Sequence, residues 1–480
     1  MVKKKLLKEK KRVKKIKYRV KKLNFDEIIK DFREYFSKIP DSRRMPQYPI
    51  EDIVISVFAM MFFQDPSMLT FQNRMKERLN KNNLETLFRV KNIPSDGTIR
   101  NVLDKIDPSF LEDAFFIIFR SLERSGVLKE FLSIDDSYTI AIDGTQYFTS
   151  YNCSCDKCLT TKKKGKDIRY HHNVLQLSLV DADQKHIIPL LSEEIVNDPD
   201  NDKYDKQDSE HKAAKRALRR LRKHLPNLKI TILGDDLYGH EPIVNLCEEL
   251  KLSYIFTCKS TSHISMFQYM NDDKESFQSI RRNNSIWIMK KTMIARLKYI
   301  GKEEKDLPKP QYKNRYYKQI NNFNYKYYDE EVPVNANHKT FCNYFELEIT
   351  DELTTKRSFF SSWITNIKVD ASNIKRLAKI GRSRWKIENE QFKTTKKGGY
   401  NLEHNYGHGE NNLSYNFYVL NVLAFLIHQI LHITCPDFND LKDKAGGYRM
   451  LYDNLKSVIK YFVFDTFDQL LIFELNEDTG

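Results

Sequence analysis

The sequence lacks a long uninterrupted apolar run. Near the N-terminus, Leu6, Leu7 and Val13 are separated by lysines, so no signal peptide is expected there. The longest apolar stretch, 413–435, is interrupted by asparagine, glutamine and histidine side chains, which are costly in lipid. We therefore expect 413–435 to form a buried helix, and we expect a cytoplasmic protein without a membrane partner.

Cysteine is also scarce, with seven residues in a chain of 480. Four occur singly, as reduced thiols do, whereas Cys153, Cys155 and Cys158 form a cluster. The C-x-C-x-x-C spacing supplies half of a zinc pattern, and His171 or His172 could complete a tetrahedral Zn²⁺ site. Because no second C-x-x-C follows, reduced thiols are the favoured interpretation. Zinc, if bound, would brace this loop rather than do chemistry.

Positive charge is concentrated at the start of the chain. Of the net charge of +15, residues 1–23 supply +12, from eleven Lys and two Arg against Glu9, which leaves +3 for the rest. A basic arm of this kind suits a polyanion, most commonly nucleic acid. A general compositional bias towards lysine is the alternative interpretation.

The length predicts two to four structural units. After the arm, residues 24–130 read as a helical domain with apolar periodicity at Phe25–Phe36, Ile50–Phe63 and Leu111–Leu122. Thr98–Leu103 resembles the start of a short helix. Helix pairs of this kind can bind DNA, although more often they only pack.

From Tyr138 the apolar period changes from helical to alternating. The predicted elements of segment 131–258 are strands at Tyr138–Asp143, Val174–Val180 and His186–Leu191, a basic helix at His211–His224, a strand at Lys229–Leu233, a helix at Glu241–Leu250 and a strand at Tyr254–Cys258. Three strands followed by helix, strand, helix and strand is the RNase H-like order. The predicted fold class is therefore α/β, with a mixed sheet.

This order of strands and helices places two aspartates at the same edge of the predicted sheet. Asp143 would end the first strand at Gly144, and Asp235 would end the fourth strand, so both would lie at one edge of the sheet. Mg²⁺ prefers hard oxygen ligands and commonly binds a few carboxylates together with water and phosphate oxygens. The pair therefore predicts a metal site, although a single aspartate at a strand end is usually a turn residue.

The remaining segments divide into three. Residues 259–370 read as a mostly β insertion, 371–435 as the second part of the core, and 436–480 as a C-terminal helical segment with a helix at 448–464. Strands in the insertion are predicted at Ser285–Lys290, Phe345–Thr350 and Ser358–Thr365. Between them, Gln311–Tyr328 is rich in lysine and tyrosine and could touch phosphates and bases, or could form a solvated loop.

A charged segment precedes the apolar 413–435 stretch. Arg384, Glu388 and Phe392 are spaced i, i+4, i+8, which places a cation, a carboxylate and an aromatic ring on one face of a regular helix. An ordinary amphipathic helix would show the same spacing. The following 398–409 loop contains glycines and two histidines, which could bind phosphates or simply turn the chain.

Three motifs in order carry a family resemblance. They are Ala-Ile-Asp143-Gly-Thr145, Leu-Gly-Asp235-Asp-Leu-Tyr238 and Arg384-Trp-Lys-Ile-Glu388. Over roughly residues 130–435 the chain resembles bacterial insertion-sequence transposases of the DDE type. It looks closest to the cut-and-paste branch, which has a β insertion and a Tyr-Arg-Glu-Lys signature.

The resemblance implies a catalytic and metal-binding triad of Asp143, Asp235 and Glu388. Asp235 is preferred to Asp136 and Asp236 because the family's second acid lies three residues before a tyrosine, here Tyr238. Glu390 is a weaker alternative for the third acid. The DNA-binding residues are expected to be Arg384, the signature arginine, together with Trp385, Lys393 and Lys396. The chain departs from the signature at two positions, with Gly381 where the family has Tyr and Thr395 where it has Lys.

The implied activity is that of a Mg²⁺-dependent transposase, in which Mn²⁺ can substitute. It would cut double-stranded DNA at the inverted-repeat ends of its element and join the 3′ ends to target DNA through two metals. A homodimer on DNA, associated with the bacterial nucleoid, is expected. An RNase H-like nuclease without strand transfer and an inactive DNA-binding relic are the alternatives. A relic would be expected to have lost an acid, and all three acids are present.

Overall fold

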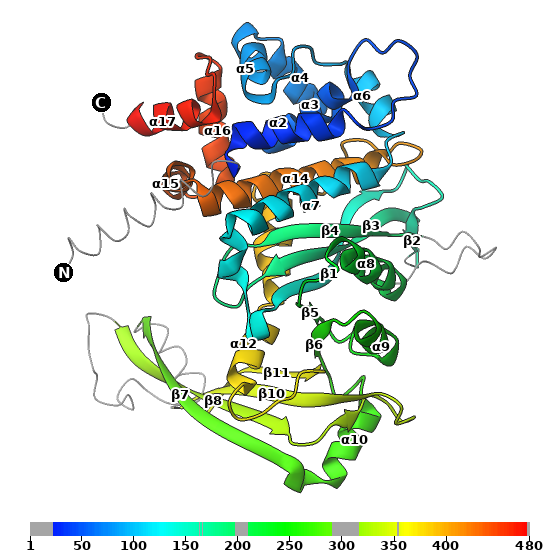
Figure 1. Ribbon diagram of the computed structural model, residues 1–480, viewed down its shortest axis with the longest axis vertical. Helices are drawn as coiled ribbons and strands as arrows, with labels where there is room; N and C mark the ends of the chain where they lie inside the picture. Colours follow the sequence, from blue (N-terminus) through cyan, green and yellow to red (C-terminus); the bar gives the residue numbers. More distant parts are fainter. Residues whose placement is uncertain are drawn as a thin grey trace. The chain divides into compact units, whose positions relative to one another are not determined.

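The chain folds into two compact units, seen in a computed structural model (Figure 1). The structure describes residues 23–162, 164–165, 167–196, 210–289, 316–352 and 355–477, so the basic arm lies almost wholly outside the described residues. Unit 1 comprises Met1–Leu132, Ile140–Asn227 and Trp385–Gly480, and unit 2 comprises Ser133–Thr139 and Leu228–Arg384.

Unit 1 begins with helices. Their bounds are α2 (Phe25–Phe36), α3 (Ile50–Phe62), α4 (Met68–Met75), α5 (Arg78–Phe88), α6 (Asp96–Leu103) and α7 (Pro108–Ser125), followed by a 3₁₀ turn at Val127–Phe131. Asn24 caps α2 by accepting the Glu27 N–H at 2.8 Å, and the aromatic face of α2 is buried. The helices predicted at Phe25–Phe36 and Ile50–Phe63 are confirmed, with Phe63 as the C-cap of α3.

The helix α14 (Leu413–Thr434) forms the centre of unit 1. It packs against α3, α7 and strand β4 (Ile188–Ile195), as Figure 1 shows. By length and composition α14 could cross a membrane, but 89% of its apolar window is buried inside the protein, which confirms the predicted buried helix. The amide nitrogens of two buried asparagines on this helix donate hydrogen bonds: Asn416 Nδ2 to the Leu103 carbonyl at 2.6 Å and Asn421 Nδ2 to the Tyr400 carbonyl at 2.7 Å.

Three helices follow α14. They are α15 (Pro436–Ala445), α16 (Tyr448–Ile459) and α17 (Phe467–Glu477). The helix predicted at 448–464 therefore ends earlier, at Ile459, since Tyr461–Val463 are exposed and carry no buried face.

The strands of unit 1 carry Asp143, the first of the three predicted acids. They are β1 (Tyr138–Ser150), β2 (Leu159–Thr161), β3 (Arg169–Val180) and β4, with β3 beside β1 and β2 and with β4 antiparallel to β3. The basic helix α8 (Glu210–His224) packs on β3 and β4 through a buried face of alanine and leucine.

The prediction that the first strand ends at Gly144 is wrong. β1 continues to Ser150, because Gly144 keeps an extended backbone and the strand beyond it buries Thr145, Tyr147 and Phe148. Asp143 therefore lies inside a long strand rather than at its end.

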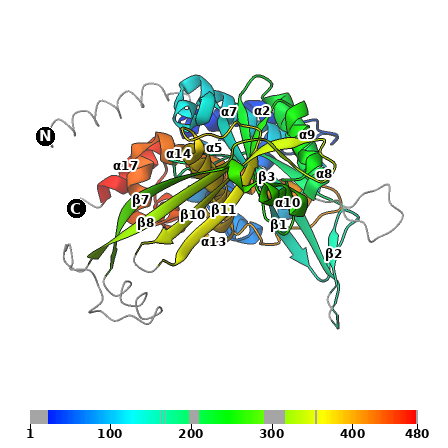
Figure 2. The ribbon, with the colours of Figure 1, turned by 90° about the horizontal axis from the view of Figure 1, so that it is seen from below.

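Unit 2 is built on a mixed sheet. Its strands are β5 (Ile230–Gly234), β6 (Ser253–Thr257), β7 (Phe277–Met289), β8 (Tyr316–Tyr328), β9 (Val332–Pro333), β10 (Phe341–Asp351) and β11 (Arg357–Thr365). Their order is β5-β6-β11-β10-β8-β7. Strands β5 and β6 are parallel, each following pair in this order is antiparallel, and β9 pairs with β10. Figure 2 shows β7, β8, β10 and β11 side by side as a twisted sheet.

The lysine- and tyrosine-rich segment is not a loop where the structure describes it. From Tyr316 it is strand β8, paired with β7 and β10, and only its first residues lie outside the description. Tyrosine and phenylalanine favour a half-buried pleated surface, and Tyr327 and Tyr328 are buried on it. Lys326 lies 3.8 Å from Glu346 on β10.

Helices join these strands. They are α9 (Glu241–Glu249), α10 (Ile264–Asp272) and α12 (Ile374–Arg382), with 3₁₀ turns at Ile134–Asp136 and Lys274–Ser276. Along the chain, β1, β3 and β4, with the short β2 between the first two, are followed by α8, β5, α9 and β6, which is the order of an RNase H-like core. The fold is thus α/β, with helices before this core and a mostly β segment between β6 and α12.

One aspartate of the helical part fixes the start of α14. Asp104 accepts four successive backbone N–H groups, those of Glu410, Asn411, Asn412 and Leu413, at 3.0–3.2 Å. Burial raises the pKa of the Asp104 carboxyl, but these hydrogen bonds outweigh it and hold the pKa below 3.8.

We predict that Asp104→Ala lowers the free energy of unfolding by about 1–3 kcal/mol, because orphaned N–H groups remain at the start of α14. Since folding lowers this pKa, the stabilisation is present above pH 3.8 and is lost as the pH falls through the folded-state value. Urea unfolding of both proteins at several pH values measures the difference. The exposed Asp167→Ala is the control, and an equal effect of both variants would refute a role for the Asp104 bonds.

Candidate active site

Asp143 is presented by the middle of β1. The residues before it, Ala141 and Ile142, are buried, whereas Asp143 itself is half-buried, and its Oδ1 accepts the Gly144 N–H at 3.0 Å. The strand thus fixes the backbone rigidly while the carboxylate reaches the surface of the core.

A second carboxylate lies beside this position. A Cβ atom added to Gly144 would lie 2.8 Å from Glu210 Oε2, so the Glu210 side chain packs directly against the backbone that follows Asp143. Glu210 is the first residue of α8. Sequence reasoning missed it, and the only signal was an acid opening an otherwise basic helix. A side chain at position 144 would displace the Glu210 carboxylate.

Asp235 follows β5 directly. It opens a turn in which the Tyr238 N–H reaches the Asp235 carbonyl at 3.2 Å and the Leu237 N–H reaches Asp235 Oδ1 at 2.9 Å. Tyr238 is fully buried against Gly234, where an added Cβ would lie 2.6 Å from the ring. The tyrosine of the motif therefore anchors the turn and leaves Asp235 half-buried at the end of its strand.

The neighbouring Asp236 has a structural role instead. Its carboxylate accepts the Lys259 N–H at 2.6 Å and the Ser262 hydroxyl at 2.5 Å, and it lies 3.5 Å from His263 Nε2. These bonds tie down the loop after β6. The preference for Asp235 over Asp236 is thus supported by how Asp236 is used. The other alternative, Asp136, is exposed in a 3₁₀ turn.

Glu388 lies on a π-helix, Ile387–Phe392. The prediction of one regular helical face for Arg384, Glu388 and Phe392 is wrong: α12 ends at Arg382, Ser383 and Arg384 form a turn, and the wider π-turn shifts the spacing. Single π-turns occur frequently at functional sites, where they re-aim one side chain. Glu388, the predicted third acid, is half-buried on this π-turn.

Two contacts fix this segment to the strands of unit 1. The Ser178 hydroxyl on β3 donates to Gln391 Oε1 at 2.6 Å in a buried site. Lys386 Nζ donates to the carbonyls of Asp181 and Gln184 in the turn between β3 and β4. Strand β3 neighbours β1, which carries Asp143. These contacts therefore hold the Glu388 segment against the strand next to β1.

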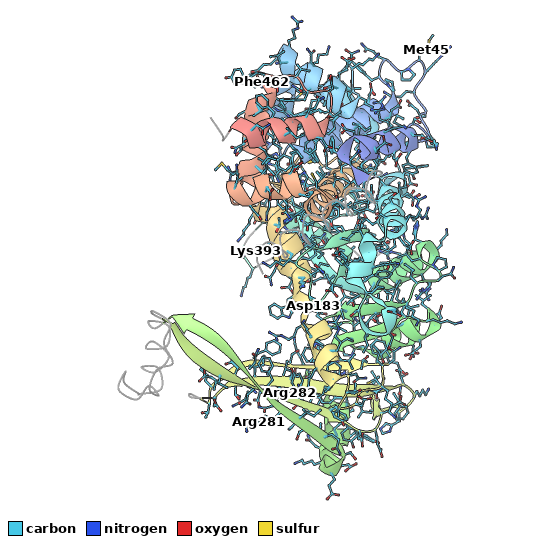
Figure 3. The ribbon with its side chains drawn as sticks, turned by 60° about the vertical axis from the view of Figure 1, so that its left-hand side comes forward. Met45, Asp183, Arg281, Arg282, Lys393 and Phe462 are labelled. Carbon is cyan, nitrogen blue, oxygen red and sulfur yellow. The ribbon has the colours of Figure 1, made fainter. Side chains whose placement is uncertain are left out.

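The candidate DNA-binding residues differ in their surroundings. Trp385 is 54% exposed and Lys393 is exposed on α13 (Lys393–Lys397); Figure 3 labels Lys393. Lys396 instead lies 2.9 Å from Glu403 in an ion pair. Arg384 is half-buried in the turn after α12, within unit 2.

A basic cavity of about 850 Å³ adjoins α13 in unit 1. Its charged lining consists of Lys185, Lys393, Lys397, Lys442, Glu390 and Asp443. Burial lowers the pKa of His432 in this lining to about 4, so the histidine is neutral at pH 7 and lysines supply the positive charge. The sequence did not reveal this cavity, because its residues come from three distant segments. Four lysines against two acids suit a phosphate backbone.

The chain's similarity to known proteins falls on this region. Residues 200–426 match the family model of the transposase DDE domain. The chain carries a transposase DDE domain. This match bears out the resemblance to the insertion-sequence DDE transposases, and it includes Asp235 and Glu388, whereas Asp143 lies upstream of it. No curated protein matches the chain significantly.

A transposase is an enzyme that acts on DNA, and DDE transposases use divalent metal ions. The side chains fit such ions: Asp143, Asp235 and Glu388 are half-buried carboxylates, and hard oxygen ligands are what Mg²⁺ and Mn²⁺ bind.

Gly381, at the signature's tyrosine position, is closely packed. A Cβ atom there would lie 2.8 Å from Trp363 Nε1 on β11, so the position has no room for a side chain. The departure from the transposase signature thus has a packing cause.

We predict that Gly381→Ala lowers the free energy of unfolding by about 1–3 kcal/mol, because the methyl group overpacks the Trp363 ring. Gly97→Ala on α6 is the matched control. It has open space at the Cβ position and should be neutral or slightly stabilising. Thermal unfolding compares the two, and a neutral Gly381→Ala would show that the close approach to Trp363 is unimportant.

Proposed function

We propose that the chain is a Mg²⁺-dependent cut-and-paste transposase. It cuts double-stranded DNA at the inverted-repeat ends of an insertion sequence and joins the freed 3′ ends to target DNA. Mn²⁺ substitutes for Mg²⁺. The active form is a homodimer on DNA, in the cytoplasm of a bacterium.

Three half-buried carboxylates support this function most directly. Asp143, Asp235 and Glu388 occur in the family's order, and each is carried by an ordered strand, strand-end turn or π-turn. The carboxylate of Asp236 is engaged by Lys259 and Ser262 in the loop after β6, which supports Asp235 as the proposed second acid.

Asp143, Asp235 and Glu388 would hold two divalent ions. Ions held there would supply activation of a water and then of a 3′ hydroxyl, together with stabilisation of the leaving oxygen of an in-line displacement. The protein residues hold the DNA in place for both steps. Lys393 and the other lysines of the basic cavity contact phosphates, and the exposed Trp385 offers a ring on which a base can stack.

Incubation with labelled DNA that carries the element's ends, together with Mg²⁺, tests the proposal. Nicks at the ends followed by joined products are expected. Nicks without joined products would indicate a nuclease instead, and binding without nicks would indicate an inactive relic.

We predict that Asp143→Asn, Asp235→Asn and Glu388→Gln each lower the cleavage rate at least about a hundredfold, more than the loss of a group that only supports a ligand typically causes. DNA affinity should stay nearly unchanged. Single-turnover cleavage and a gel-shift titration measure the two quantities.

Two isosteric variants serve as controls for the triad. Glu390→Gln changes an exposed acid two residues from Glu388, and Asp236→Asn changes the acid next to Asp235. Both should retain most of the cleavage rate once the fraction of folded protein is accounted for. Full activity in any one triad variant would remove that residue from the proposed site.

We predict that deletion of residues 1–23 weakens DNA binding and flattens its dependence on salt. The arm carries +12, and each phosphate that it neutralises releases counterions. Binding titrations at several salt concentrations give the slope for the full chain and the truncated chain. Unchanged affinity and slope would make the arm incidental to DNA binding.

A further inference from the structure

Four side chains of types that commonly bind metal ions converge in unit 1. None of them belongs to the three sequence motifs that contain the candidate acids. Cys155, Cys158, His172 and His408 place one ligand atom each so that all four lie within 4.8 Å of one another. The cysteines come from the β1–β2 loop, His172 from β3, and His408 from the loop before α14. Cys158 and His172 are both only 2% exposed.

We propose that these four residues bind a structural Zn²⁺ ion. In a tetrahedral site with Zn–S near 2.3 Å and Zn–N near 2.05 Å, ligand atoms stand about 3.8 Å apart for two sulfurs, about 3.6 Å for sulfur and nitrogen, and about 3.3 Å for two nitrogens.

The observed spacings follow this pattern. Cys155 Sγ and Cys158 Sγ are 3.8 Å apart, and the Nε2 atoms of His172 and His408 are 3.3 Å apart. The sulfur–nitrogen distances are 3.6 Å for Cys155 and His172, 3.3 Å for Cys158 and His172, and 3.5 Å for Cys158 and His408. Five of the six pairs of ligand atoms thus have spacings close to those of a tetrahedral Zn²⁺ site, and the sixth pair, Cys155 Sγ and the ring nitrogen of His408, lies within 4.8 Å.

Hydrogen bonding alone accounts poorly for this arrangement. Two imidazole nitrogens can share only one proton, and thiols are weak donors, so a metal-free cluster has no reason to aim all four atoms at one point. A Zn²⁺ ion would instead neutralise two thiolates in a largely buried place. The Cys155 N–H already donates to Cys158 Sγ at 3.4 Å, a bond that favours a thiolate.

The surroundings of the cluster also suit a metal. Nδ1 of His172 lies 3.7 Å from Glu194 Oε1, and metal-bound histidines commonly direct their second nitrogen to a carboxylate. Glu194 is in turn held by the Tyr147 hydroxyl at 2.7 Å. The Phe148 ring packs beside the cluster, with its centroid 4.9 Å from that of the His408 ring.

The structure corrects the expected ligand set. Cys153 is exposed and outside the cluster, and His171 points to the other face of β3, where it contacts the Leu159 carbonyl and the Thr161 hydroxyl. The fourth ligand is His408, which was distant in the sequence. Its loop is held by α6, since Arg100 donates to the Tyr406 carbonyl and Asp104 accepts the N–H groups before α14.

Four protein ligands close the coordination shell, so the ion has no open position for water and its role is structural. It would join the β1–β2 loop and β3 to the loop before α14. Tyr147 and Phe148, which line the cluster, lie on the same strand as Asp143. Loss of zinc should therefore loosen β1 without removing any acid.

Elemental analysis of the full-length protein, purified without chelator and then desalted, tests the proposal. About one zinc per chain is expected. The Cys155→Ser, Cys158→Ser double variant and His408→Gln should lose it. Cys153→Ser and His404→Gln change neighbouring residues of the same type outside the cluster and should retain it. Zinc that stays in the double variant, or less than about a tenth of an equivalent in wild type after incubation with ZnCl₂, would overturn the site.

A second measurement covers variants that fail to fold. In zinc-loaded wild type, Cys155 and Cys158 should resist alkylation while Cys153 reacts, and 1,10-phenanthroline should expose both and lower the melting temperature by several degrees. Cobalt(II) in place of zinc should give the absorption bands of a tetrahedral thiolate site. Equal alkylation of all three cysteines with zinc present, or an octahedral cobalt spectrum, would contradict the assignment.

Discussion

The buried hydrogen bond from Ser178 on β3 to Gln391 fixes the position of the segment that carries Glu388, the proposed third acid. It fixes the π-turn that carries Glu388 to the strand next to β1, and Lys386 adds a second attachment at the turn between β3 and β4. A buried polar pair of this kind is favourable only when both partners are present, so it specifies one position of the helix along the sheet. A carboxylate that must bind a metal ion needs such a defined backbone.

Much of the fold follows from local pattern. Alternating apolar residues located β3, β4, β5 and β6, and helical periodicity located α2, α3 and α8, because these elements each bury one face. The local pattern did not predict that β1 continues past Gly144, because glycine usually ends a strand and here burial continues beyond it. It also did not predict that aromatic residues among lysines form the inner strand β8. The π-turn at Glu388 could not be predicted, since it depends on what Gln391 contacts across the core.

The candidate site, like the fold, was predicted only in part from the sequence. Motif order predicted Asp143, Asp235 and Glu388, and the structure added a reason to set Asp236 aside. Glu210, the basic cavity and His408 escaped sequence reasoning, because each acquires its meaning only from residues far along the chain. His408 and Cys158 are 250 positions apart, yet their ligand atoms are 3.5 Å apart. The cysteine pair alone left reduced thiols as the simpler interpretation.

Iron-directed cleavage tests most directly whether Asp143, Asp235 and Glu388 bind the divalent ions of a transposase. Replacing Mg²⁺ by Fe²⁺ in the full-length protein and adding ascorbate generates hydroxyl radicals at the bound iron, and mass spectrometry then locates the backbone cuts. If the three acids bind the ion, cuts are expected within β1 around Asp143, in the Asp235–Tyr238 turn and in the 387–392 π-turn. Excess Mg²⁺ should suppress all of them. Cuts confined to other segments, or cuts that Mg²⁺ does not suppress, would contradict binding at the three acids.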